Sequence, residues 1–172
     1  MSGTGLKPYT EFILPPNVVS KLDVSHLVAE AERADNELTA EAVGEKIGSY
    51  EHPELVISDQ LKSFLEQNSI KLDNSHDRSE LITQLRLLKD KVPVVHMTFA
   101  VIADRESLQQ LIEWFRASVH PQVVIEAGLQ PSLVAGVYLR TPNHVHDLSL
   151  RAALDGRHGA LVEELEALYV GK

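Results

Sequence analysis

The chain has 172 residues, of which 44% are hydrophobic and 24% charged, and its 16 basic and 25 acidic residues give a net charge of −9. This length and balance indicate a soluble globular chain with room for a hydrophobic core. The negative charge and the scarcity of aromatic residues argue against nucleic-acid binding, which uses clustered basic or stacking aromatic side chains. The absence of cysteine excludes disulfides, thiolate catalysis and zinc–thiolate sites.

No stretch of the sequence approaches the roughly 20 consecutive apolar residues that a membrane-spanning helix requires. The first residues, Met1 to Gly5, contain no apolar core of the kind found in signal peptides. We therefore expect a cytoplasmic protein that does not itself insert into a membrane.

Residues 1–20 are predicted to form a flexible lead-in. Glycine at positions 3 and 5 and proline at positions 8, 15 and 16 interrupt any helical or strand periodicity. Terminal segments are commonly poorly ordered unless something ties them down, so we expect this one to be mobile in the isolated protein.

Residues 21–92 are predicted to form an acidic module of about three helices. Their apolar residues recur at steps of three and four, which is typical of amphipathic helices that bury one face. Asp77 and Glu80 have the spacing of a capping box, and Pro93 ends the third helix. The residues that mark the ends of the three helices are Asp23 and Gly48, Ser58 and Asn68, and Asp77 and Val92.

Residues 93–172 alternate between strand-like and helical patterns and predict a small α+β module. A helix capped by Asp104 separates the first two strands, and a closing helix runs from Ser149 toward Leu168. The predicted strands comprise residues 94–100, 123–125, 137–139 and 144–148, with turns near Gly128 to Pro131 and Thr141 to Asn143.

The predicted fold class is therefore α+β: a helical module followed by a sheet of about four strands with flanking helices. We expect few contacts across the boundary at residue 93, so that each module keeps its own core. Leucines of the closing helix that do not face the sheet are candidate partner-binding residues. They are Leu161, Leu165 and Leu168.

Acidic residues are concentrated in the first half of the chain. Residues 1–90 contain 9 basic and 16 acidic side chains, whereas residues 91–172 contain 7 and 9. This asymmetry supports the division into two modules and suggests that the first module meets basic or amphipathic partners.

Histidines provide the main candidate for chemistry, because imidazole is the commonest general base and metal ligand. His144 and His146 lie two apart on a predicted strand, so both side chains point to one face. A third ligand would have to come from His96 or His120. The alternative interpretation is a pair of exposed histidines beside a turn.

Other catalytic patterns are missing from the sequence. Gly3 and Gly5 precede Lys7, but no Gly-Lys-Ser/Thr ending follows, so a phosphate loop is unsupported. No serine has the spacing of a nucleophile elbow. Asp147 and Ser149 are interpreted as the cap of the closing helix. We therefore expect no cofactor and no catalytic residue.

The segment from Val123 to Leu154 resembles the C-terminal signature of the delta subunit of the F-type ATP synthase, the family of the oligomycin-sensitivity-conferring protein. In that family a strand leads into Pro-Ser-Leu, a small-residue pair and a strand that often ends in a basic residue. A tight turn then leads into the pattern Asp-x-Ser-apolar-Arg-x-x-Leu. The matching residues here are Pro131, Ser132, Leu133, Gly136, Arg140, Asp147, Ser149, Arg151 and Leu154.

Three features depart from the family pattern. Gln130 stands where the family usually has aspartate, and Ala135 precedes Gly136 where it usually has a second glycine. The family's N-terminal domain is a six-helix bundle, whereas three helices are legible before Pro93. The motif residues themselves have structural roles: Gly136 permits close backbone approach beside a packed helix, and Arg151 can pair with Asp147 or Asp155.

The resemblance implies a non-catalytic stator subunit for ATP synthesis and hydrogen ion transport. The helical module would bind N-terminal segments of the alpha subunits in the catalytic head, and the α+β module would bind the b-subunit stalk. The protein would then be peripheral on the cytoplasmic face of the cell membrane. The alternatives are a metal-dependent hydrolase using His96, His144 and His146, or a regulatory adaptor that shares only the fold.

Overall fold

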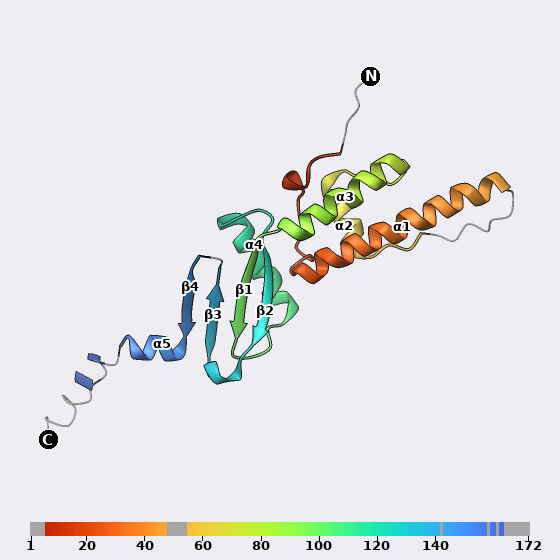
Figure 1. Ribbon diagram of the computed structural model, residues 1–172. Coiled ribbons are helices and arrows are strands. Elements are labelled where there is room, and N and C mark those ends of the chain that lie inside the picture. The colour runs from red at the N-terminus through yellow and green to blue at the C-terminus, as the bar shows by residue number, and fades with distance from the viewer. Residues whose placement is uncertain (1–5, 48–54, 142, 158, 161, 164–172) are drawn as a thin grey trace. The chain divides into compact units, whose positions relative to one another are not determined.

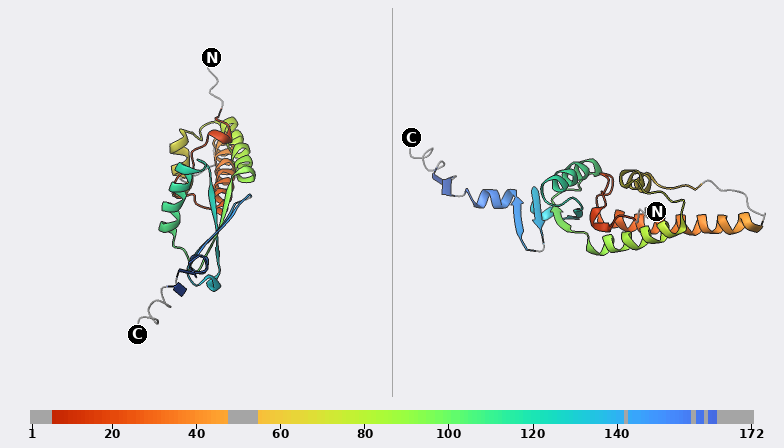
Figure 2. Two further views of the ribbon diagram at one scale, coloured as in Figure 1. Left: turned by 90° about the vertical axis from the view of Figure 1, so that its left-hand side faces the viewer. Right: turned by 90° about the horizontal axis from the view of Figure 1, so that it is seen from above.

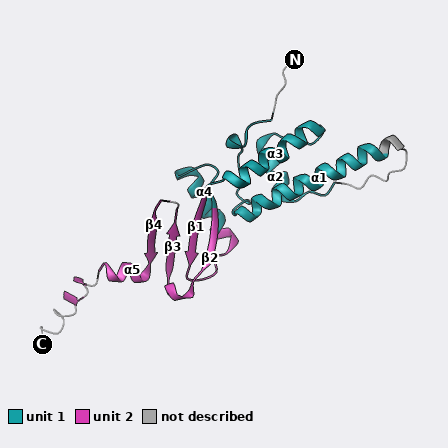
Figure 3. Cartoon of the chain, in the orientation of Figure 1, with its two compact units in different colours: residues 1–93, 108–124 teal, residues 94–107, 125–172 magenta. Residues whose placement is uncertain are grey.

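The computed structural model describes residues 6–47, 55–141, 143–157, 159–160 and 162–163 and confirms an α+β fold (Figure 1). The chain divides into two compact units, which we call unit 1 (residues 1–93 and 108–124) and unit 2 (residues 94–107 and 125–172) (Figure 3). Its elements in chain order are η1 (Tyr9–Glu11), α1 (Lys21–Ile47), α2 (Asp59–Asn68), α3 (Ser75–Lys91), β1 (Val94–Phe99), α4 (Arg105–Ser118), β2 (Val124–Leu129), η2 (Pro131–Leu133), β3 (Gly136–Arg140), β4 (Val145–Ser149) and α5 (Leu150–Asp155).

The three predicted helices of the first half are present, and local capping explains where they begin. Ser20 and Asp23 form a capping box, because the Ser20 N–H donates to the Asp23 carboxylate over 2.9 Å and the Asp23 N–H donates to Ser20 Oγ over 3.2 Å. Asp23 was predicted as the N-cap itself, but that position belongs to Ser20. Ser58 caps α2 as expected, by accepting from the Leu61 N–H.

The predicted capping box of the third helix is wrong. α3 begins at Ser75 because Asn74 is its N-cap and accepts a hydrogen bond from the His76 N–H over 3.0 Å. Asp77 therefore lies in the first turn, near the positive end of the helix, and does not cap it. The helix ends at Lys91, and its C-cap Val92 immediately precedes the predicted stop at Pro93.

The core of unit 1 is built from the apolar stripes of its helices, as their spacing predicted. Phe64 of α2 and Phe12 of the lead-in meet edge to face, with ring centroids 5.3 Å apart. The buried helical residues include Val24, Leu27, Val28, Ala31 and Ala34 of α1, Leu61, Phe64 and Leu65 of α2, Leu81, Leu85 and Leu88 of α3, and Ile112 and Phe115 of α4. Figure 2 shows α1 and α3 lying side by side in both views.

The lead-in packs into the core of unit 1 over the part that the structure describes, residues 6–20. Its apolar residues Phe12, Leu14, Val18 and Val19 are buried. Its backbone is held by polar side chains: the Asn68 amide both donates to and accepts from the main chain of Ile13, over 2.9 and 2.8 Å. Regular structure in the lead-in is limited to the single turn η1, and these hydrogen bonds satisfy backbone groups outside it.

Two side chains from the second half of the sequence bind the same lead-in. Arg116 donates to the carbonyl oxygens of Leu14 and Pro15, over 3.0 and 2.9 Å, and also to those of Val18 and Val123. Gln122 donates to the carbonyls of Tyr9 and Phe12. Burial lowers the pKa of Arg116 from its ordinary value to about 10.

The compact units divide at the predicted boundary, residue 93, but the chain then returns to unit 1 over a further segment. Residues 108–124, including most of α4, belong with the helices of unit 1. The change of hydrophobic period at Pro93 marks where the first strand begins, but it does not show which core the following helix joins. A fragment that begins at residue 91 would contain α4 and Arg116 but would lack the lead-in, whose carbonyl groups Arg116 binds.

Unit 2 contains almost all of a four-stranded sheet with strand order β2-β1-β3-β4. β3 runs antiparallel to both β1 and β4, whereas β1 and β2 point the same way (Figure 1). Asp104 caps α4, as predicted, by accepting from the Ser107 N–H over 2.8 Å. β2 continues to Leu129, so Gly128 lies in a strand where a turn was predicted.

The continuous helix that follows β4 is shorter than the predicted closing helix. α5 ends at Asp155, and Gly156 follows as its C-cap. Glycine disfavours a helical interior, which accounts for the end of the continuous helix at this point. In the ranges that the structure describes, no helix is both long enough and apolar enough to cross a membrane.

Candidate functional site

The residues that match the family pattern, from Pro131 to Leu154, lie in unit 2, along the path from the end of β2 to α5. Pro131, Ser132 and Leu133 form the single turn η2. Gln130, which departs from the family's usual aspartate, donates from its side-chain amide to Ser132 Oγ over 3.0 Å. The turn is thus held locally by the residue that differs from the pattern.

Gly136 occupies a position that no other residue fits. Its φ is +95°, and a Cβ built on it would lie 2.4 Å from the Leu148 carbonyl oxygen and 2.7 Å from Ser149 Cα. The predicted close approach is confirmed, but the neighbour is the backbone at the end of β4, opposite Gly136 in the ladder, and not the face of a helix.

Asp147 and Ser149 form the predicted helix cap. Ser149 Oγ accepts from the Ala152 N–H over 3.3 Å, and the Asp147 carboxylate accepts from the Ser149 N–H over 2.9 Å. Hydrogen bonds from Ser149, helped by the charge of Arg151, hold the pKa of Asp147 below its ordinary value. Arg151 pairs with Asp155 at 3.9 Å on the open surface, where such pairs contribute little.

Arg140 lies on the polar face of the sheet, beside a shallow cavity of about 580 Å³. It stands directly opposite His96 in the β1–β3 ladder. The His96 ring lies 3.2 Å from the carboxylate of Glu126. Every side chain that lines the cavity is polar: His96, Thr98, Gln130, Tyr138, Arg140 and Thr141. A face of this kind is the ordinary solvated side of an antiparallel sheet.

The histidines do not assemble as the metal-site hypothesis required. The rings of His144 and His146 have centroids 6.2 Å apart. However, His146 lies opposite Leu139, whereas His96 lies opposite Arg140, and neighbouring residues on a strand face opposite ways. His96 is therefore on the other face of the sheet. Among the described residues, no group of three or more His, Asp or Glu side chains could hold a metal ion.

Apolar side chains are exposed where β4 passes into α5. Leu148 at the end of the strand is 62% exposed, and Leu150 and Leu154 in the helix are 47% and 54% exposed. Leu150 and Leu154 are four residues apart, so they share one face of α5. We call these three leucines the β4–α5 apolar surface.

This surface was not singled out by sequence reasoning, which placed the partner-binding leucines farther along. Leu161, Leu165 and Leu168 lie outside the described residues. The signal that bears on this surface is Gly156, which follows α5 as its C-cap and ends the continuous helix at Asp155, one residue after Leu154.

No protein-family model matches the chain, and no curated protein matches it. The functional interpretation therefore depends on the motif residues and on the surfaces that the two units present.

Proposed function

We propose that the chain is a non-catalytic stator subunit that links the catalytic head of an F-type ATP synthase to the b-subunit stalk. The observation that carries the proposal is the β4–α5 apolar surface, which adjoins the motif resembling the delta subunit. The motif residues hold turns, caps and strand contacts, and none of these roles needs a substrate. A protein built in this way works by holding partners together.

The β4–α5 apolar surface is suited to a helical partner. Exposed leucines at i and i+4 on a helix are the usual anchors of helix-against-helix binding. Removing apolar surface from water contributes about 25 cal/mol for each Å² buried, so a stalk helix covering Leu148, Leu150 and Leu154 would bind through that term. The partner that the resemblance indicates is the b-subunit coiled coil.

Unit 1 would then face the catalytic head. The resemblance assigns the helical half to N-terminal segments of the alpha subunits, and the excess of acidic residues before residue 91 favours basic or amphipathic segments. Attachment to the membrane would come through the stalk, which makes this a peripheral subunit on the cytoplasmic face. Torque from the rotor would be resisted by the two interfaces.

Calorimetry of the whole chain with a peptide from the C-terminal part of the organism's own b subunit tests the proposal. We expect measurable heat and a saturable transition. Leu154→Arg should weaken binding at least about tenfold, because it places a charge in an apolar contact. Ala152→Arg is the matched control, since Ala152 is two residues from both Leu150 and Leu154 and lies on the other side of α5, so the same charge should leave binding as in the parent.

Circular dichroism of both variants separates lost binding from lost folding. If the peptide gives no heat with the folded parent, or if both arginine variants bind equally well, the stator proposal fails. An adaptor that shares only the fold would give that result.

A further inference from the structure

The inner strands of the sheet carry polar side chains in two facing pairs. His96 of β1 lies opposite Arg140 of β3, and Thr98 lies opposite Tyr138. Alternate residues of a strand share a face, so all four side chains belong to one face of the sheet. β1 and β3 each have a neighbouring strand on both sides, in the order β2-β1-β3-β4. Side chains on such paired strands are held more precisely than side chains on loops.

The cavity of about 580 Å³ lies over these pairs, and Gly128 of β2 adjoins it. A Cβ built on Gly128 would lie 3.5 Å from Thr98 Oγ1, so a side chain there would project beside Thr98, which lines the cavity. That distance is an ordinary contact, and the φ of Gly128 is not in the left-handed region. Neither the backbone nor the packing therefore requires glycine. A glycine inside a strand weakens it and often marks a place where a ligand approaches.

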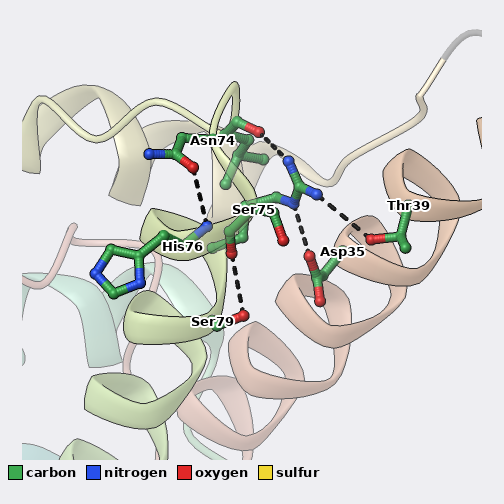
Figure 4. Close-up of polar contacts among 8 residues, drawn as sticks. Asp35, Thr39, Asn74, Ser75, His76 and Ser79 are labelled. Carbon is green, nitrogen blue, oxygen red and sulfur yellow. Dashed lines mark hydrogen bonds and ion pairs between the residues drawn. The ribbon is translucent and has the colours of Figure 1, made fainter. Parts of the chain in front are cut away.

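Arg140 lines the cavity with a guanidinium that no other described residue binds. Arg78 in unit 1 shows the contrast: Asp35 and Thr39 of α1 (Figure 4) both bind its guanidinium, over 2.7 and 3.4 Å. A guanidinium presents a planar fork of N–H donors that matches the two oxygens of a carboxylate. Arg140 keeps that fork available on an open face.

The two carboxylates that the strands place on this face are already engaged. Glu126 Oε2 lies 3.2 Å from Nδ1 of His96. Asp147, opposite Tyr138, accepts from the Ser149 N–H over 2.9 Å. Arg140 is thus left as the charge on this face without a counter-ion among the described residues, and one anionic group would balance it. The net charge of −9 disfavours a ligand that carries several negative charges.

Hydroxyl groups stand next to this arginine. Those of Thr98 and Tyr138 have no hydrogen-bond partner within the part of the chain that the structure describes. The hydroxyl of Thr141, by contrast, is used in the turn, where it donates to the His144 carbonyl and accepts from the His144 N–H. Because a hydroxyl both donates and accepts, the free pair would match hydroxyl groups of a ligand.

We propose that this face of the sheet binds a small hydroxylated carboxylate, of the sugar-acid class. Its carboxylate lies against the fork of Arg140, and its hydroxyl-bearing chain lies over Gly128, beside Thr98 and Tyr138. The inference does not require the stator assignment. The proposed stalk contact includes Leu148, which pairs with Val137 and so lies on the other face of the sheet. Either proposal can therefore fail without the other.

Calorimetry of the full chain with D-gluconate tests the proposal. Sorbitol has the same chain of hydroxyl groups without the carboxylate, and acetate has the carboxylate without the hydroxyl groups. We expect saturable binding of gluconate with a dissociation constant of about 1 mM or lower. Sorbitol and acetate should each bind at least about tenfold more weakly.

Two variants locate the site. Arg140→Gln removes the charge, and Gly128→Val fills the space beside Thr98 with a residue that favours strands. Each should weaken gluconate binding at least about tenfold, while Gly128→Val should be no less stable than the parent. The matched controls are Arg151→Gln, at an arginine whose side chain is 87% exposed on α5, and Ala127→Val, which adds the same side chain on the opposite face of β2.

Both controls should bind gluconate as the parent does, and circular dichroism checks that every variant is folded. Gluconate binding that does not saturate by about 10 mM would show that the face is only solvated, and would overturn the proposal. Sorbitol binding as tight as that of gluconate would overturn it as well. So would folded Arg140→Gln or Gly128→Val protein that binds gluconate as tightly as the parent.

Discussion

The lead-in of unit 1 and the junction of β4 and α5 in unit 2 both contain apolar side chains close together in the sequence, yet only those of the lead-in are covered. Phe12, Leu14 and Val18 of the lead-in are buried, whereas Leu148 and Leu150 are about half exposed or more. The difference lies in the polar side chains nearby. In unit 1 they bind the backbone of the irregular segment and hold its apolar side chains in the core.

No comparable set of side chains secures a cover over the β4–α5 apolar surface among the described residues. In unit 1, the apolar side chains of the lead-in are covered by the unit's own residues. Unit 2 presents apolar surface that a partner would cover. The comparison therefore predicts that substituting the side chains that bind the lead-in, such as Arg116, will affect folding. Substitutions on the β4–α5 apolar surface should instead affect binding.

The largest effect is expected from Arg116, because its guanidinium serves four backbone carbonyls of unit 1. Arg116→Met keeps much of the apolar stem but leaves those acceptors without their donor. We expect a loss of about 3 kcal/mol in the free energy of unfolding, since each buried unsatisfied group costs about 1–3 kcal/mol. Urea denaturation measures it.

Arg86→Met is the matched control for Arg116. Arg86 pairs with Glu32 at 2.7 Å, but on the open surface, where such a pair contributes about 1 kcal/mol or less. Equal losses in the two variants would show that Arg116 is an ordinary surface arginine and that the lead-in is not clamped by it.

The next effect concerns the hairpin of unit 2. Gly136→Ala forces a side chain into a left-handed backbone position, 2.4 Å from the Leu148 carbonyl. We expect a destabilisation of about 2 kcal/mol or more, since strained backbone conformations cost about 1–3 kcal/mol before any clash is counted. The denaturation midpoint of the variant and its near-ultraviolet spectrum report the loss.

Gly159→Ala is the control for Gly136, because no atom lies within 4 Å of a Cβ built there. It should be neutral or slightly stabilising, as expected for alanine in a helical segment. A Gly136→Ala variant as stable as the parent would mean that β3 and β4 do not approach as described.

A smaller effect is expected from the cap of α5. Ser149→Ala removes the oxygen that accepts from the Ala152 N–H, and the usual loss for such a cap is about 1 kcal/mol. Binding of the b-subunit peptide should stay nearly unchanged once the folded fraction is taken into account. A large loss of binding at unchanged stability would instead place Ser149 in the partner-binding surface.

Local signals explain most of what could be predicted from the sequence. The stripe of α1, the cap at Ser58, the stop before Pro93 and the cap at Ser149 all depend on residues within a few positions of one another. The buried lead-in depends on Arg116, about 100 residues away, and nothing in the composition of residues 1–20 indicates that a distant guanidinium satisfies their carbonyls.

In the candidate site, too, only the features that depend on nearby residues could be predicted from the sequence. A close backbone approach at Gly136 could be predicted because glycine inside a strand usually marks a bulge, a bend or an approach of this kind. Which leucines stay exposed depends on where α5 ends and on what covers it, and spacing alone does not show this. The separation of His96 from His146 likewise depends on strand register, which the sequence pattern left open.

The smallest effect is the pH dependence of the lead-in, through Asp23. Burial raises the pKa of its carboxyl group, but hydrogen bonds from Ser20, Gln60 and Val19 outweigh burial and hold it below its ordinary value of 3.8. Because the folded pKa is the lower one, the unfolded chain takes up the proton first as the pH falls. The contribution of Asp23 is therefore complete above the unfolded pKa and is lost as the pH falls through the folded pKa.

Asp23→Asn isolates this contribution from those of the other carboxyl groups. We expect the free energy of unfolding of the parent to fall more steeply than that of the variant as the pH drops below about 4. Above about pH 6 the difference between the two proteins should be constant. Urea denaturation at several pH values measures both curves. Parallel curves down to about pH 3 would mean that the amide groups of Val19 and Ser20 do not hold an ionised Asp23, and that the first turn of α1 is capped in another way.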